Sequence, residues 1–561
     1  MSSSFSPIVG ISFGNTSSSI ATVKNNDKVE VIANPDGERV IATALSYRDG
    51  DEYHGGQAIQ QLIRNPKNTI INFRDLIGQP KFSKLSEDLK NRCSAGAPVV
   101  DIGDDVPGFI ITNSESNKEI KLSVDEVVAR HLKNLKLAAD DYIGVNNKKA
   151  VITVPYDFND LQKERIAKAA SKAGLEIVQF IHEPSAALLS HLTTKTTSIH
   201  KDSNVVVADF GGLQSSVTVF AIRNNGIFTK IYTESRQDLG GSKIDDVLLK
   251  YLNSEFQKKT KVDATKNPRS LAKLKSNAIL TKKTLSNTSN ANISIDSLAD
   301  GLDFNSSINV FKYDLVVRNV INEMVTFVEQ AVEKSGLDKL EVDSILLTGG
   351  ASFTPKITQT LQVVFPENQV KVISLVAGNE LQHPDEMLSA GAAVQASLLA
   401  DDLYEEDDLE KLLGHSVDVP QLNECIGVLD GSKKFVTIFD KYTSLPARQS
   451  FKLKSLVDGA DLEVYTGKLN IKEEIIEKEE APKKEEKKED DDDDDENDWS
   501  EDEDDEPEVL KTKEIEPVEK LAELGIKATK NGVELIFEIS RENKLKVIAR
   551  DLKTNEVLQQ I

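Results

Sequence analysis

A strand, glycine turn and strand occur together twice in the first half of the chain. Residues 11–23 read ISFGNTSSSIATV and residues 208–220 read ADFGGLQSSVTVF. A third glycine turn, Gly349-Gly350, follows another apolar run. Backbone N–H groups at such turns can approach phosphate oxygens because no Cβ stands in the way. Two similar halves that each present a glycine turn to one cleft would hold a phosphate chain from both sides.

Residues 8–400 alternate strand-like and helix-like segments, which is typical of an α/β fold. Apolar runs predict strands at 150–154, 204–208 and 344–348. Periodic segments predict helices at 124–139, 159–173, 268–285 and 314–334. Asn159 precedes its helix and Glu164 lies in the first turns, so we expect an N-terminal cap there.

The composition of the sequence and the predicted elements change after residue 400. Residues 401–413 (DDLYEEDDLEKLL) are acidic and predict an interdomain linker. Short β-like runs fill 414–470, and strands resume within 509–561, where 531–550 predict a β-hairpin. The intervening residues 471–508 are acidic and of low complexity, so we predict a disordered insertion in a small β-domain.

The net charge of −24 is concentrated in one segment, because residues 472–508 carry 23 acidic and 6 basic side chains. The remaining surface is only mildly acidic, and direct nucleic-acid binding is not expected. We find neither a secretory signal nor a run of about 18 apolar residues, so we expect a cytoplasmic protein without a membrane span. Cys93 and Cys425 lie in no metal-ligand pattern and are expected to be reduced thiols.

The ordered motifs of residues 8–400 closely resemble the nucleotide-binding domain of DnaK-type (heat shock protein 70) chaperones, members of the actin-like ATPase superfamily. In chain order, the matching stretches include VGISFGNT, AVITVPYDFND, IHEPSAAL, VVVADFGG, DLGGSKID, LLTGGASFTPKI and PDEMLSAGAAVQA. The resemblance implies a two-lobed, actin-like nucleotide-binding domain over residues 1–400. It also implies a small, truncated β-sandwich-type domain of the substrate-binding kind, without a helical lid.

The same resemblance implies that ATP, or ADP, binds between the lobes. The residues that match the family's nucleotide-binding positions are Gly14, Asn15, Thr16, Asp209, Gly211, Gly212, Gly240, Gly241, Lys282, Lys283, Ser286, Gly349, Gly350 and Asp385. No protein metal ligand is predicted, and the sequence leaves open whether Mg²⁺ accompanies the nucleotide.

The positions that carry the family's chemistry are changed. Ser12 stands where the family has a metal-side aspartate, Ser216 replaces an acidic residue, and we assign the catalytic lysine's position to Ile59. Phosphoryl transfer needs a positioned water, a metal ion and cations against developing charge. Losing one such group typically costs about two to three orders of magnitude in rate. We therefore expect a pseudo-ATPase without catalytic residues, which binds ATP and does not hydrolyse it.

The C-terminal part also departs from the family. The linker is charged, and only ten residues follow Asp551, which leaves no length for a lid. This combination, with tracts such as IANPDGER, is similar to atypical family members that work at the fungal ribosome. It implies a stable heterodimer with a zuotin-like, ribosome-bound J-protein. Because exposed strand edges favour pairing, we expect a partner strand to cover a sheet edge. The resemblance also implies stimulation of a second, ribosome-bound DnaK-type chaperone that handles nascent chains.

Two other functions remain open from the sequence. The chain could be an active, ATP-hydrolysing and peptide-binding chaperone, which a single-turnover ATP assay would reveal. It could also be a nucleotide-exchange factor, which would release ADP from a loaded chaperone.

Overall fold

The computed structural model describes residues 8–24, 28–112, 118–193, 202–223, 226–365, 370–374, 383–400, 419–430, 432–453, 459–476, 508–527 and 529–561. The chain forms two compact units, Met1–Val417 and Asp418–Ile561. The predicted linker at 401–413 and residues 477–507 of the predicted insertion lie outside the described residues.

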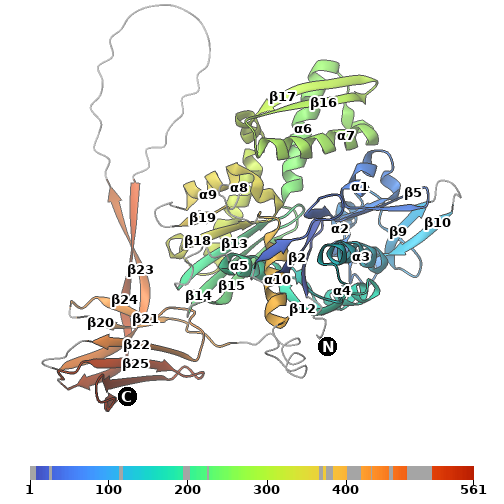
Figure 1. The fold of residues 1–561 in the computed structure, drawn as a ribbon. Coiled ribbons are helices and arrows are strands. Elements are labelled where there is room, and N and C mark those ends of the chain that lie inside the picture. The colour runs from blue at the N-terminus through green and yellow to red at the C-terminus, as the bar shows by residue number, and fades with distance from the viewer. Residues whose placement is uncertain are drawn as a thin grey trace, which may run out of the picture. The chain divides into compact units, whose positions relative to one another are not determined.

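The first unit contains two large sheets of matching topology (Figure 1). The first sheet has the order β12-β11-β1-β2-β3, with β4 paired to β2. Its strands are β1 (Val9–Phe13), β2 (Ser17–Val23), β3 (Val29–Val31), β4 (Val40–Ala42), β11 (Lys149–Val154) and β12 (Glu176–His182). β1 is antiparallel to β2 and parallel to β11, which is parallel to β12.

The second sheet repeats this plan in the order β19-β18-β13-β14-β15. Its strands are β13 (Ser203–Phe210), β14 (Ser215–Arg223), β15 (Ile227–Arg236), β18 (Ser344–Thr348) and β19 (Lys371–Ile373). Again the central strand, β13, is antiparallel to the next strand in the chain and parallel to a later one, β18. The sequence repeat is therefore a repeat of structure, and the α/β, actin-like fold is confirmed.

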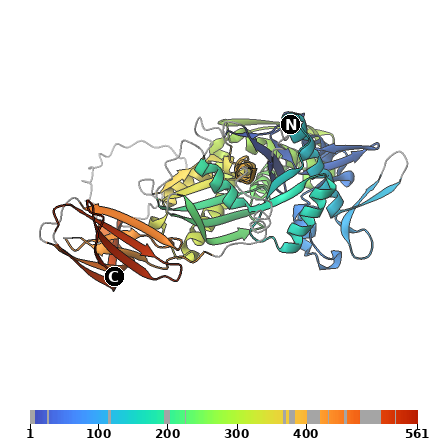
Figure 2. The same ribbon diagram turned by 60° about the horizontal axis from the view of Figure 1, so that its bottom comes forward.

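Ten helices are described, all of them in the first unit. They are α1 (Gly55–Gln60), α2 (Glu87–Cys93), α3 (Val124–Ile143), α4 (Asp160–Lys172), α5 (Glu183–Thr193), α6 (Gly241–Thr260), α7 (Pro268–Leu285), α8 (Val310–Lys334), α9 (Pro355–Val364) and α10 (Met387–Ala400). Helix α10 packs against α5, β1 and β2, in the middle of the unit (Figure 2). A Cβ on Gly391 would lie 1.8 Å from the Ala186 carbonyl oxygen, so a glycine is needed where α10 meets α5.

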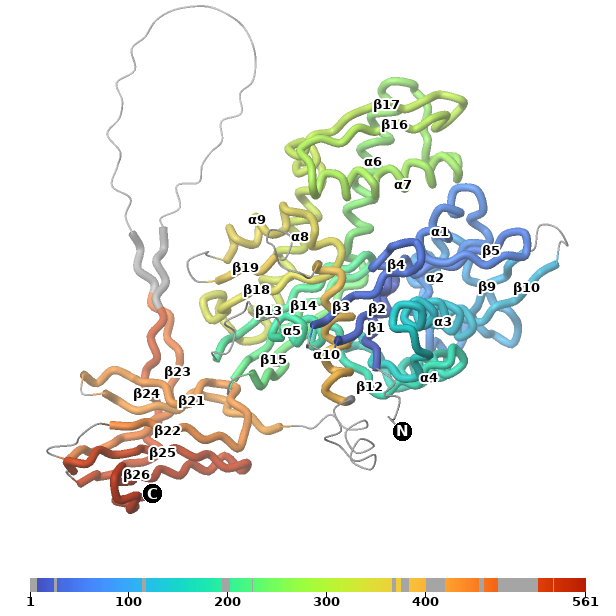
Figure 3. Tube along the Cα trace, viewed as in Figure 1, coloured from blue at the N-terminus to red at the C-terminus, as the bar shows by residue number. Residues whose placement is uncertain are grey.

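Three small sheets complete the first unit. Their strands are β5 (Ala44–Arg48), β6 (Asp51–His54) and β7 (Thr69–Ile71); β8 (Val100–Asp101), β9 (Pro107–Thr112) and β10 (Glu119–Ser123); and β16 (Asn290–Ala299) and β17 (Leu302–Asn309). The hairpin β16–β17 packs with α6 and α7 into one group, which is visible in the Cα trace (Figure 3).

The second unit consists of two four-stranded sheets, ordered β21-β20-β23-β24 and β22-β25-β26-β27. The strands are β20 (Cys425–Leu429), β21 (Phe435–Phe439), β22 (Ala447–Leu453), β23 (Ala460–Ile476), β24 (Glu508–Ile526), β25 (Val533–Ile539), β26 (Leu545–Asp551) and β27 (Val557–Gln560). One apolar core contains Ile426 and Val464 from the first sheet and Phe537 and Val547 from the second.

One expectation for this unit needs correction. The described residues supply eight strands in two four-stranded sheets, and truncation relative to the family's domain stays a prediction. The insertion predicted from residue 471 begins later, because β23 continues to Ile476 and β24 starts at Glu508. Composition alone did not predict these strand ends, because their charged residues form strand through pairing between β23 and β24. Lys472, for example, lies opposite Thr512.

Most predicted elements of the first unit are confirmed, and the expected ends of α7 and β18 agree with the structure. Asn159 caps α4 as expected, but its capping partner is Gln162 and not Glu164. The hairpin predicted at 531–550 is β25–β26. Cys93 and Cys425 are both buried free thiols. None of the described helices combines the length and apolar character needed to cross a lipid bilayer.

Candidate nucleotide-binding site

The first two glycine turns have the same backbone geometry. The Gly14 N–H donates to the Ser17 carbonyl at 3.1 Å, and the Gly211 N–H donates to the Gln214 carbonyl at 3.0 Å. Each bond closes the turn between a central strand and its antiparallel neighbour. The repeat seen in the sequence therefore produces two equivalent turns.

The three glycine turns meet in one place. A Cβ on Gly212 would lie 2.4 Å from Thr16 Oγ1, so the second turn contacts the first. A Cβ on Gly349 would lie 2.3 Å from Asp209 Oδ1, so the third turn contacts the end of β13. Gly349 also has a φ of +84°, a conformation that favours glycine. The space around Gly350 is open, with no atom within 4 Å of an added Cβ.

Helix α6 begins against the second turn. The Gly241 N–H donates to the Gly211 carbonyl at 2.9 Å, and the Ser242 N–H donates to the Gly212 carbonyl at 2.8 Å. A Cβ on Gly240 would lie 2.8 Å from the Gly212 carbonyl oxygen. The amino end of a 20-residue helix thus lies beside the glycine turns, and its dipole favours an anion there.

The predicted adenine-side residues are only partly brought to this cradle. The Lys282 ammonium donates to the Gly241 carbonyl at 3.1 Å and is paired with Asp245 at 2.7 Å. The Ser286 hydroxyl is bound to its own helix, at the Lys282 carbonyl. Burial raises the pKa of Asp385, while the nearby Lys283 lowers it.

The two positions where the family resemblance implies a carboxylate are buried serines in the strands that flank the turns. Ser12 lies on β1, 6% exposed, and Ser216 lies on β14, 9% exposed, opposite Asp209. A neutral hydroxyl at either position cannot hold a cation as a carboxylate does.

A buried cation, Arg74, is tied to the first turn through Asp75 and Asn15. Arg74 is 3% exposed and lies at the start of the short 3₁₀ helix Arg74–Leu76. Ile59, to which we assign the position of the family's lysine, lies on α1 and is 39% exposed. That assignment stays a prediction, and Arg74 is a cation that we did not single out from the sequence.

Arg74 is held between two carboxylates. Its Nε donates to Asp75 Oδ1 and its Nη1 donates to Glu183 Oε1, each at 3.0 Å. Asp75 in turn accepts from the Asn15 side-chain amide at 2.6 Å, which ties the group to the first turn. Arg74 Nη2 is buried and has no hydrogen-bond partner among the described residues. The sequence signal for this cluster was the charged Arg-Asp pair inside the apolar stretch INFRDLIG.

Acidic groups outnumber cations in this cluster. Burial raises the pKa of both Glu183 and Asp209 above its ordinary value, and the positive charge of Arg74 acts against that shift. Burying an unpaired carboxylate costs free energy, so Glu183 and Asp209 limit which ligands can bind in the site.

The donor set does not fit a divalent cation held by the protein. Within the described ranges, no three His, Cys, Asp or Glu side chains are placed to hold a metal ion. Of the three carboxylates near the turns, Asp75 and Glu183 are already engaged by Arg74. A phosphate chain fits better, because the space around Gly350 is open and the buried Arg74 Nη2 has no hydrogen-bond partner among the described residues.

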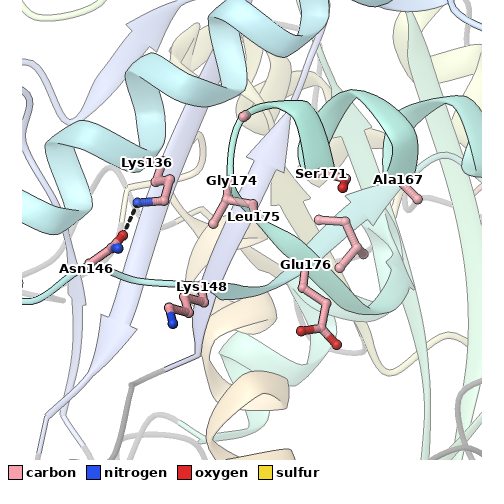
Figure 4. Close-up of a pocket in the computed structure, with 10 residues that line it drawn as sticks. Lys136, Asn146, Lys148, Ala167, Ser171, Gly174, Leu175 and Glu176 are labelled. Atoms are coloured by element: carbon pink, nitrogen blue, oxygen red, sulfur yellow. Dashed lines mark hydrogen bonds between the residues drawn. The ribbon is translucent and has the colours of Figure 1, made fainter.

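A separate cavity of about 670 Å³ contains none of the predicted site residues. It lies where α3 and α4 end near β12 and includes Lys136, Asn146 and Lys148 (Figure 4). The Lys136 ammonium donates to Asn146 Oδ1 at 2.5 Å and is paired with Asp140. Because this cation is already compensated, the cavity is not a second candidate site.

Comparison with known proteins places these features in a family. The sequence model of the family described as "Hsp70 protein" matches residues 8–478. The chain is 49% identical to "Ribosome-associated complex subunit SSZ1" of Saccharomyces cerevisiae, over 99% of each protein. It is 36% identical to a heat shock protein 70 homolog of Schizosaccharomyces pombe, over 98% of this chain and 94% of that protein. It is 30% identical to human "Heat shock 70 kDa protein 14", over 83% of this chain and 89% of that protein. This chain therefore belongs to the Hsp70 protein family.

Proposed function

We propose that this chain is a ribosome-associated subunit of the Hsp70 family that binds ATP, or ADP, and does not hydrolyse it. The main support for this proposal is a contrast, within one site, between the glycine turns and the residues at the positions expected to be catalytic. The glycine cradle is intact, while Ser12 and Ser216 replace carboxylates and Arg74 is locked between Asp75 and Glu183.

This arrangement binds phosphate without providing for its transfer. The amino end of α6 lies beside the glycine turns, and the helix dipole favours an anion there. The positive charge of Arg74 is already compensated by Asp75 and Glu183, so it stabilises charge that develops on a transferred phosphate less than an unpaired cation would. Neither serine can act as a carboxylate toward a water molecule.

The printed name of the yeast relative describes a subunit of a ribosome-associated complex. We propose the same role for this chain, in the cytoplasm, as the stable partner of a zuotin-like J-protein that contacts the ribosome. The pair would stimulate a second, ribosome-bound Hsp70-family chaperone. The local charge of residues 472–508 supports indirect attachment, because an acidic segment is repelled by RNA.

Reconstitution tests this role. The chain, the J-protein and the second chaperone are purified from one species, and ATP turnover by the second chaperone is measured with each partner alone and with both together. We expect a stable complex of the chain with the J-protein, and full stimulation only when both are present. Equal stimulation by the J-protein alone, or no complex, contradicts the proposed role.

A further inference from the structure

His131 is a buried histidine outside the glycine turns that the nucleotide site does not use directly. It lies on α3, 0% exposed, with ring centroids 5.7 Å from Phe13 and 5.8 Å from Phe73. Its Nε2 is 2.9 Å from Ser18 Oγ, and Ser18 Oγ is 2.9 Å from Thr43 Oγ1. The Thr43 hydroxyl donates to the Gly14 carbonyl at 2.9 Å. A continuous chain of hydrogen bonds thus connects α3 to the first glycine turn.

The hydrogen bonds in this series can run in only one donor-to-acceptor direction. A hydroxyl has a single hydrogen, and that of Thr43 is used at the Gly14 carbonyl. Ser18 must therefore donate to Thr43, and His131 Nε2 must donate to Ser18. His131 is then a neutral imidazole with its hydrogen on Nε2, and Nδ1 has no hydrogen-bond partner among the described residues. Burial and the neighbouring His54 lower the pKa of His131 to about 3, which agrees with this neutral form.

At its Gly14 end, this series of hydrogen bonds fixes the orientation of a peptide group in the turn. In a planar trans peptide the carbonyl and the following N–H point in opposite directions. Because Thr43 holds the Gly14 carbonyl on its own side, the Asn15 N–H points the other way. The Thr43 N–H also donates to the Thr16 carbonyl at 3.0 Å, so Thr43 holds two carbonyls of the turn. The Asn15 side chain is held separately by Asp75.

We infer that His131 is a positioning residue for nucleotide binding, which sets the first glycine turn through Ser18 and Thr43. This inference rests on the proposed nucleotide site and adds the device that orders it. His131 contacts no phosphate-binding residue itself. Its donor matters because, without it, Ser18 can turn its hydrogen away from Thr43, and Thr43 can then turn its own away from the Gly14 carbonyl.

The test compares four single variants and the His131→Phe/Thr43→Val double variant of the full-length chain by calorimetric titration with ATP. His131→Phe keeps a ring between Phe13 and Phe73 but removes the donor, and Thr43→Val removes the last hydroxyl with little change of shape. His131→Gln retains an N–H donor. Thr218→Val is the matched control, because it removes a buried hydroxyl paired with Thr233 at 2.8 Å in the second sheet.

We expect His131→Phe and Thr43→Val each to weaken ATP binding by about tenfold, the effect of losing one buried hydrogen bond. The double variant should bind ATP no more weakly than the weaker-binding single variant, because both substitutions interrupt the same series of hydrogen bonds. His131→Gln should recover most of the affinity, and Thr218→Val should bind as the wild type does. Melting temperatures without nucleotide report the structural cost of each change separately.

The failures of the two proposals are distinguishable. A wild-type chain that does not bind ATP overturns the proposed function. Wild-type binding combined with unchanged affinity in His131→Phe and Thr43→Val overturns the positioning role, whatever their melting temperatures. Additive losses in the double variant, or no recovery in His131→Gln, also overturn it. If His131→Phe does not fold, Thr43→Val and His131→Gln decide the question between them.

Discussion

Arg74 shows how a single side chain can alter the chemistry of a glycine-turn site. Its guanidinium is buried, bridges Asp75 and Glu183, and leaves one nitrogen without a described partner. The planar fork of arginine suits two carboxylates at once, which a single ammonium cannot match. The family resemblance singled out Ser12 and Ser216, but the sequence did not reveal that Arg74 is tied to the first turn, because that depends on packing between distant segments.

The Arg74 pairs should be important for folding. Arg74→Met leaves the buried Glu183 without its ion-pair partner and removes one partner of Asp75, which keeps Asn15 and Arg92. We expect a loss of about 3–5 kcal/mol in the free energy of unfolding. Adding Glu183→Gln to that variant should recover part of the loss, because one uncompensated charge is removed. Chemical denaturation without nucleotide measures both.

Arg130→Met is the control for this experiment, since Arg130 pairs with Glu52 at the surface and is 43% exposed. Exposed pairs contribute about 0–1 kcal/mol. A loss in Arg74→Met no larger than that in Arg130→Met would contradict the buried network.

The neutral state of His131 predicts a pH dependence of stability. Its pKa is about 3 in the folded chain and 6.5 ordinarily, so below pH 6.5 the unfolded chain takes up a proton that the folded chain does not. The contribution of His131 is therefore complete above pH 6.5 and is lost as the pH falls toward 3. Between these values wild-type stability should fall by about 1.4 kcal/mol per pH unit more steeply than that of His131→Phe. Denaturation midpoints from pH 7 to pH 4.5 measure this, and parallel curves would contradict it.

At the scale of elements, the sequence predicted best where a segment carries its own signals. Helix α7 begins with Asn267 as its cap and Pro268 in the first turn, and its bounds were predicted correctly. The ends of β23 and β24 were missed because their stability depends on pairing with each other. The contact between the glycine turns could be expected from their repetition in the sequence. The series of hydrogen bonds from His131 to Gly14 could not be expected, because it joins four separate segments of the sequence.

The third glycine turn offers a test at this scale. Gly349→Ala places a Cβ against Asp209 at a φ of +84°, so we expect a loss of about 1–3 kcal/mol in the free energy of unfolding. Gly350→Ala meets open space and should change that free energy by less than about 0.5 kcal/mol. Equal effects of the two changes in thermal or chemical denaturation would contradict the close approach of the turn to Asp209.

At the scale of the whole molecule, two sheets of matching topology place equivalent turns around one site, and a separate β-unit follows. The sequence predicted this organisation because each sheet carries its own copy of the turn. Membership of the Hsp70 family agrees with it. The central claim is that the cradle has been kept while the groups needed for phosphoryl transfer have been replaced.

The most direct test of that claim follows the fate of bound nucleotide in a single turnover. The purified chain is loaded with one equivalent of ATP, free nucleotide is removed, and bound ATP and ADP are quantified over several hours. We predict that the bound nucleotide remains ATP. Conversion to ADP in proportion to the occupied sites, abolished when Asp209→Asn removes the retained carboxylate, would contradict the claim.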